Sequence, residues 1–262
     1  MFYTTGMPTS SPDRKPIANT AAAAGAASAA LPAPPRIPRR PTTNRRRSGL
    51  SLDAIVAATI EELDESGVAG LSMRKVAERL GTGAASLYAY VSGKDELLEL
   101  VFDELVGQVA LPEPDPEAWR EQLITVMRDF HGVLVSHRDA ALAGLGRVPT
   151  TPKTLDAAES MVGIMRAGGL SDHVIALGID QLILYVAASA FEQSLYAHGA
   201  MSSDEVEQYF EDVHRFYSAL PADRFPRLAS IADDMTGFDG DDRLQFGLDA
   251  LISGLEAVSR RG

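Results

Sequence analysis

The apolar side chains from Ser51 onward recur with the period of an α-helix, and this pattern constrains the fold more than any other feature of the chain. The first such segment carries its large apolar residues on one helical face: Leu52, Ile55, Val56, Ile60 and Leu63. The alternation of apolar and polar residues that is typical of a half-buried strand never extends beyond a few residues. The sequence therefore predicts an all-α protein.

Capping residues and helix breakers set the expected boundaries. Ser51 and Ser72 are good N-caps, and Gly67 and Gly81 are good stops. Ser92 with Asp95 has the spacing of a capping box and predicts the start of a fourth helix, after a short helix at about 83–90. Further helices are predicted at about 117–137, 138–145, 154–167, 172–198, 204–219 and 241–260, with prolines between several of them.

Composition divides the chain into three parts. Residues 1–48 are rich in Pro, Ala, Ser and Thr and are predicted to be a disordered tail, because they lack the apolar surface to offset ordering entropy. Two helical domains are predicted to follow, at 49–108 and 109–262. The tail ends in a basic arm from Arg36 to Arg47, which either contacts a partner or is merely solvated.

Charge and composition exclude several function classes. The chain has no cysteine, which excludes disulfides, thiolate catalysis and cysteine-ligated zinc and is typical of the cytoplasm. No segment is expected to span a membrane. The net charge of −12 hides an uneven distribution, since residues 1–48 carry eight basic side chains and one acidic one. Nucleic acid responds to the local field, so an acidic chain can still bind it.

The segment from Leu71 to Tyr90 reads as two short helices joined by a tight turn at Gly81, which is the pattern of a helix-turn-helix. In this motif the first helix braces the second, whose N-terminal half enters the major groove of DNA. Between Ser72 and Lys94 there are four basic residues against the single acid Glu78. The motif and its local charge predict DNA binding.

The run Leu71-Ser-Met-Arg-Lys-Val-Ala-Glu-Arg-Leu-Gly81, followed by Ser86-Leu-Tyr-Ala-Tyr-Val91 and Ser92-Gly-Lys94, resembles the DNA-binding signature of the tetracycline-repressor (TetR) family. The resemblance implies phosphate contacts from Arg74 and Lys94, with Ser72 near the DNA backbone. It also implies a DNA-facing surface on the second helix, formed by Thr82, Ala84, Ala85, Ser86, Tyr88 and Tyr90. We further expect Arg45, Arg46 and Arg47 to enter the flanking minor groove.

That surface offers no Arg, Asn or Gln, the side chains that read guanine or adenine with two hydrogen bonds. Specificity is therefore expected to come from hydroxyl contacts, thymine methyl groups and DNA shape.

The second domain resembles that of the tetracycline repressor itself, through Ser136-His-Arg-Asp139 with Leu145-Gly146 and Pro149, and through Phe191-Glu-Gln193. The resemblance implies a ligand pocket, but the position of the metal-binding histidine falls at Gly144. No metal, no cofactor and no response to magnesium–tetracycline are therefore expected.

We predict an unidentified, bulky and largely hydrophobic inducer, because the candidate lining is rich in Met and aromatic side chains. Each Met and aromatic residue is also compatible with plain core. The candidates are Gln108, Met127, Phe130, His131, His137, Met161, Met165, Gln181, Tyr185 and Gln193.

Two apolar stripes predict a homodimer, because in the family the corresponding helices pair with their mates. The first stripe is Leu244, Leu248, Leu251 and Leu255, and the second is Val174, Leu177, Leu182, Tyr185 and Ala188. Burial of the first stripe within one chain is the alternative. A two-fold dimer would bind a pseudo-palindromic operator.

These features predict a transcriptional regulator, most simply a repressor that a small hydrophobic ligand releases from its operator. A ligand-responsive activator and a helical scaffold that binds no DNA are the alternatives. The nucleophile-elbow, zinc-protease and phosphate-loop motifs are missing from the sequence, which argues against an enzyme.

Overall fold

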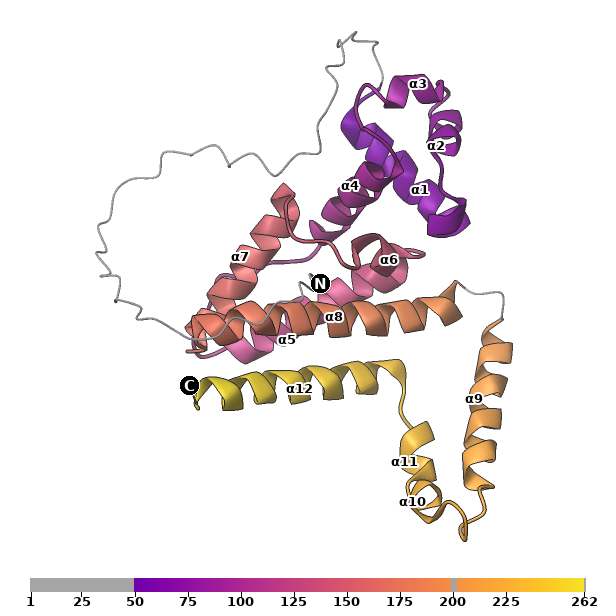
Figure 1. The fold of residues 1–262 in the computed structure, drawn as a ribbon, viewed down its shortest axis with the longest axis vertical. Helices are drawn as coiled ribbons and strands as arrows, with labels where there is room; N and C mark the ends of the chain where they lie inside the picture. The colour runs from indigo at the N-terminus through magenta and orange to yellow at the C-terminus, as the bar shows by residue number, and fades with distance from the viewer. Residues whose placement is uncertain (1–49, 199–201, 262) are drawn as a thin grey trace, which may run out of the picture. The chain divides into compact units, whose positions relative to one another are not determined.

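The computed structural model describes residues 50–198 and 202–261, and every regular element within these ranges is a helix (Figure 1). The prediction of an all-α fold is confirmed. The predicted tail at 1–48, with Arg45, Arg46 and Arg47, lies outside the described residues.

Four helices form the head of the protein, which we define as residues 50–106: α1 (Leu52–Gly70), α2 (Met73–Arg79), α3 (Ala84–Leu87) and α4 (Lys94–Val106). The predicted caps are confirmed, since the hydroxyls of Ser51 and Ser72 accept hydrogen bonds from backbone N–H groups in the first turns of α1 and α2. Gly81 has φ of 63° and follows the end of α2, as predicted, whereas Gly67, with φ of 65°, interrupts α1 before its end at Gly70 and so is not the stop that was predicted; a positive φ favours glycine at both positions.

Two further boundary predictions in the head were wrong. Helix α3 ends at Leu87 rather than near Tyr90. Ser92 does not cap α4, whose N-cap is Gly93. Instead the Ser92 backbone N–H donates to the Glu96 carboxylate at 2.6 Å. The acidic side chain of the first turn therefore satisfies the backbone without a serine hydroxyl.

The rest of the described chain forms eight helices. They are α5 (Trp119–Ser136), α6 (Ala140–Gly144), α7 (Pro152–Ala167), α8 (Asp172–Ala197), α9 (Ser203–Ser218), α10 (Pro226–Ala229), α11 (Ala232–Thr236) and α12 (Gly240–Ser259). The sequence reading missed α10 and α11, because helices of four and five residues are too short to show a period.

Helix α8 lies at the centre of this second region, with α5, α6, α7 and α12 packed against it (Figure 1). Leu182 on α8 and Leu248 on α12 are fully buried within the chain, and Leu244 is 2% exposed. The prediction that the leucine stripe of α12 forms a dimer surface is therefore wrong for Leu244 and Leu248. They fill the core between α12 and α8, which is the alternative left open by the sequence.

Among the described residues, α8 is the one helix long and apolar enough to cross a membrane by length and composition alone. A helix that is apolar on all sides is equally typical of a protein core. The neighbours that pack on α8, and the burial of Val174, Leu182 and Val186 beneath them, give it that second role here.

Candidate nucleic-acid interface and ligand cavity

Buried apolar side chains anchor the helix pair that is predicted to read DNA. Leu87 of α3 and Val91 just beyond it are at most 2% exposed, and Val76 of α2 is fully buried beside them. Leu87 anchors α3, and Ala84 also packs against the core, so Ala85 is the residue of this short helix that faces fully outward. Ala85 is exposed, and the exposed fraction of Tyr88 is 50%.

Two of the basic residues of α2 point away from this surface. Arg79 contacts the carboxylates of Glu61, Glu62 and Glu65 on α1, and Lys75 lies 3.1 Å from Glu62. The Ser66 hydroxyl donates to Glu62, which is 6% exposed. That hydrogen bond, together with those from Arg79 and Lys75, lowers the pKa of Glu62 to about 2 although burial acts in the opposite direction. The positive charge counted in the sequence is thus largely neutralised inside the head.

The other predicted DNA contacts divide into three groups. The Arg74 side chain is 82% exposed and lies 3.3 Å from Glu78 one turn on, so it remains accessible. Lys94 and Tyr90 have protein partners: the Lys94 ammonium donates to the carbonyl of Val68, and the Tyr90 hydroxyl donates to that of Leu50 at 2.7 Å. Thr82, Ala84 and Ser86 are half-buried.

A polar joint connects the end of α1 to the turn between α5 and α6. His137 Nδ1 lies 2.9 Å from the Asp64 carboxylate, and the Arg138 backbone N–H donates to the same group. The Asp139 carboxylate accepts the N–H of Val68 at 2.9 Å. His137 was predicted to line a ligand pocket, and this is wrong, because Asp64 draws its ring to the head.

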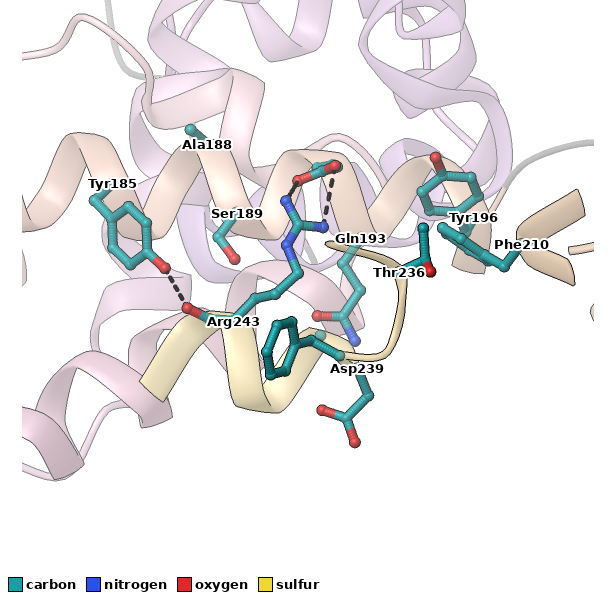
Figure 2. A pocket seen from close by; sticks show the side chains of 12 residues that line it. Tyr185, Ala188, Ser189, Gln193, Tyr196, Phe210, Thr236, Asp239 and Arg243 are labelled. Carbon is teal, nitrogen blue, oxygen red and sulfur yellow. Dashed lines mark hydrogen bonds and ion pairs between the residues drawn. The ribbon is translucent and has the colours of Figure 1, made fainter. Parts of the chain in front are cut away.

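A cavity of about 500 Å³ opens where the C-terminal half of α8 meets the start of α12 and the α9–α11 segment (Figure 2). Its lining combines four aromatic rings with six polar or charged side chains: Tyr185, Ala188, Ser189, Glu192, Gln193, Tyr196, Phe210, Thr236, Phe238, Asp239, Gly240 and Arg243. Arg243 bonds both oxygens of Glu192, at 3.3 and 2.9 Å, and its carbonyl accepts the Tyr185 hydroxyl. This volume and chemistry suit a small organic molecule.

Of the ten predicted ligand contacts, Tyr185 and Gln193 line this cavity. Gln108 and Gln181 are exposed, because their helix faces point to solvent rather than to the centre as predicted. Phe130 and the methionines take the plain core role that the sequence had left open, since none is more than 7% exposed and none lines the cavity. The methionines are Met127, Met161 and Met165.

His131 lies directly behind the cavity wall. Its Nε2 is 3.2 Å from the hydroxyl of Ser189, which lines the cavity, and the residue is only 5% exposed. Burial lowers the pKa of His131 from its ordinary value of 6.5, so the ring is held neutral. A neutral imidazole can either donate to or accept from Ser189.

Most of the charged and aromatic lining was missed by the sequence reading. Glu192 is adjacent to the predicted Gln193, but Arg243 and Phe238 lie more than forty positions away along the chain. Only the folding of α12 back along α8 brings them together. Gly144, expected to remove a metal ligand, sits directly against Phe102, where a Cβ would collide with the ring. Any side chain at this position would require the Phe102 ring to move.

Comparison with known proteins identifies the relationship. The sequence model of the family described as "Bacterial regulatory proteins, tetR family" matches residues 55–101. The model described as "Tetracyclin repressor-like, C-terminal domain" matches residues 111–259, more than half of the chain. The chain belongs to the tetracycline-repressor family. As members of this family are transcriptional regulators, this TetR-family protein is a DNA-binding regulator.

Three relatives show how far the similarity extends. The chain is 33% identical to the HTH-type transcriptional repressor DrrR1 of Streptomyces coeruleorubidus, over 81% of this chain and 80% of the relative. It is 28% identical to the tetracycline repressor protein class D of Escherichia coli, over 79% and 89%. The crystal structure of the TetR family protein ActR of Streptomyces coelicolor in complex with actinorhodin is 38% identical. It has a TM-score of 0.75 and covers 81% of this chain and 98% of its own.

The buried His131 makes stability depend on pH. Because the pKa of His131 is lowered in the folded state, the unfolded chain takes up a proton at this residue more readily, and the contribution of His131 to the free energy of unfolding falls as pH falls below about 6.5. His131→Gln keeps a partner for Ser189 and cannot titrate. Between about pH 7.5 and about pH 5.5, urea unfolding should show a smaller loss of stability for this variant than for the wild type. The exposed His173→Gln should behave as the wild type, and equal losses in all three proteins would contradict the assignment.

Proposed function

We propose that the protein is a cytoplasmic transcriptional repressor that binds a pseudo-palindromic operator as a homodimer and is released by a bulky, largely hydrophobic aromatic ligand. The observation that carries the proposal is the presence in one chain of an outward-facing α3 and of an aromatic cavity beside α8. Coupling between two such sites is what ligand-controlled DNA binding requires.

The DNA contact is proposed to rest on few charges. Arg74 is the exposed cation of the α2–α3 surface, whereas Lys75 and Arg79 are neutralised by the carboxylates of α1. Tyr88, Ala85, Thr82, Ala84 and Ser86 offer hydroxyl and methyl contacts to the groove, and Ser72 lies at the start of α2. Lys94 and Tyr90 are proposed to act mainly by holding α3 in place. The remaining electrostatic attraction is assigned to Arg45, Arg46 and Arg47.

The chemistry of the cavity supports an aromatic ligand. Tyr185, Tyr196, Phe210 and Phe238 supply ring surfaces for stacking, and Gln193 with the Arg243–Glu192 pair supplies hydrogen bonds around the mouth. The related ActR is described in complex with actinorhodin, which makes that compound a reasonable first probe. Tetracycline with magnesium is a poor one, because Phe102 closes the position of the missing histidine.

A second copy of the chain is proposed to cover the outer faces of α8 and α12. Leu177 and Leu184 on α8 are 57% and 43% exposed, and Phe246 on α12 is 77% exposed. The opposite faces of both helices are already buried in the core. The dimer would therefore use these outer residues and not the buried Leu244 and Leu248.

Replacing Arg74 should weaken operator binding for every sequence tested. Arg74→Ala removes one phosphate contact, so the slope of log affinity against log salt should fall by roughly 1, and replacement of Arg45, Arg46 and Arg47 should flatten it further. Fluorescence anisotropy with the intergenic DNA beside the gene measures both quantities. Arg128→Ala, an exposed cation on α5, is the matched control. An unchanged slope in the Arg74 variant would remove this residue from the interface.

Truncating a cavity ring should weaken the ligand and spare the operator. Phe238 and Phe216 are both exposed, at 60% and 65%, but only Phe238 lines the cavity. With actinorhodin as the probe, calorimetry should show Phe238→Ala binding about 10-fold more weakly, while Phe216→Ala binds as the wild type. Release from the operator should likewise need more actinorhodin for Phe238→Ala than for Phe216→Ala or the wild type. Equal losses in both variants would place the ligand elsewhere, and no binding by the wild type would exclude this compound class.

A charge on the outer face of α12 should break the dimer. Phe246→Glu would have to bury a carboxylate opposite its symmetry mate, so sedimentation velocity should show a shift toward monomer. Phe216→Glu on α9 carries the same change away from that face and should remain dimeric. A dimer that survives Phe246→Glu would show that the two copies meet through another surface.

A further inference from the structure

Helix α4 belongs to the head, yet its C-terminal half is embedded in the second region. The Phe102 ring of α4 packs over Gly144, the last residue of α6, and no space for a Cβ remains between them. On its other side the ring meets Phe130 of α5 edge to face, with centroids 6.2 Å apart. Phe102 thus restrains the lateral position of α4 between α5 and α6.

The next residue makes a second, polar attachment. The Asp103 carboxylate accepts the backbone N–H groups of Lys153 at 2.9 Å and Thr154 at 3.0 Å, in the first turn of α7. Asp103 is 9% exposed, so this pair of bonds is shielded from water. An anion is favoured at a helix N-terminus, where free N–H groups and the helix dipole converge. Glu99 adds a bond from the Thr150 hydroxyl one turn earlier on α4.

The polar attachment is separate from the apolar face of α4. Leu97, Leu98, Val101 and Leu105 are all at most 6% exposed and belong to the core, and Phe102 packs against that core one turn from Leu98, whereas Asp103 lies on the opposite face of the helix. Changing Asp103 therefore alters how the head is held without emptying its core. The thirteen residues of α4 extend for about 20 Å, so a small tilt at its C-terminal half moves α3 by a larger distance.

We propose that Phe102 and Asp103 are positioning residues that fix the direction of α4, through Gly144 and the N-terminus of α7, and thereby set the half-site spacing that the dimer accepts. The inference rests on the proposed operator-binding dimer. It assigns these residues no contact with DNA or ligand. They affect the distance between the two heads of the dimer, so changing them should leave the affinity for a single half-site unchanged.

The test compares full operators of different spacing with an isolated half-site, using anisotropy and the unliganded full-length dimer. The wild type should bind the operator of one spacing about 10-fold more tightly than operators whose half-sites are one base pair closer or farther apart. Asp103→Ala should lose most of that preference and keep its half-site affinity. Asp103→Asn, which retains one acceptor oxygen, should keep part of it. Glu104→Ala is the matched control, because Glu104 bonds only the exposed Lys153 ammonium beside the same turn.

A second pair of variants tests the ring contact and does not depend on the folding of Asp103→Ala. Gly144→Ala drives a methyl group into Phe102 and should shift or abolish the spacing preference. Gly144→Ala with Phe102→Leu relieves the collision but also removes the ring contact, so it should keep the half-site affinity and show a weaker spacing preference than the wild type. A merely structural defect would instead lower half-site and full-site affinity together.

The outcomes separate this inference from the proposed function. If the wild type binds neither operator nor half-site, the proposed function fails. If it binds but shows no spacing preference, or if the Asp103 and Gly144 variants keep the wild-type preference, the positioning role is overturned. Parallel loss of half-site affinity in these variants would also overturn it.

Discussion

The structure depends on the packing of one long, mainly apolar helix, α8. α8 is packed by α5, α6, α7 and α12, and its inner residues, such as Leu182 and Val186, are fully buried. Its remaining surface has two further uses. The C-terminal half forms one wall of the aromatic cavity, and the outer face exposes Leu177 and Leu184. One helix therefore contributes residues to the core, to the candidate ligand site and to the proposed dimer face.

Electrostatics in the head act mainly within the protein. Glu62 has a lowered pKa because Ser66, Arg79 and Lys75 hydrogen-bond to its charged form, and the same contacts keep Arg79 and Lys75 on the α1 side of α2. Arg74 is left as the exposed cation of the helix pair. The recognition surface is consequently short of both charge and base-reading groups, and the arginines upstream gain importance in the proposed DNA contact.

The head is joined to the second region by polar contacts as well as by the Phe102 ring. His137 meets Asp64, Asp139 accepts the N–H of Val68, and Asp103 accepts two N–H groups of α7. Hydrogen bonds fix direction more strictly than apolar contact does, because they weaken steeply when misaligned. A joint of this kind holds one orientation of α4.

The sequence by itself determined the helical class, the helix-turn-helix and the main helix ends, because caps, left-handed glycines and apolar periodicity are local properties. Ser51, Ser72 and Gly81 act as their residue types predict, and Gly67 breaks α1 without ending it. Tertiary structure alone decided which face of each helix is covered. It put Leu244 and Leu248 in the core, His137 beside Asp64, and Arg243 opposite Glu192 from far along the chain. Periodicity reports that a face is apolar, but what covers that face depends on packing between distant segments, and no local pattern records it.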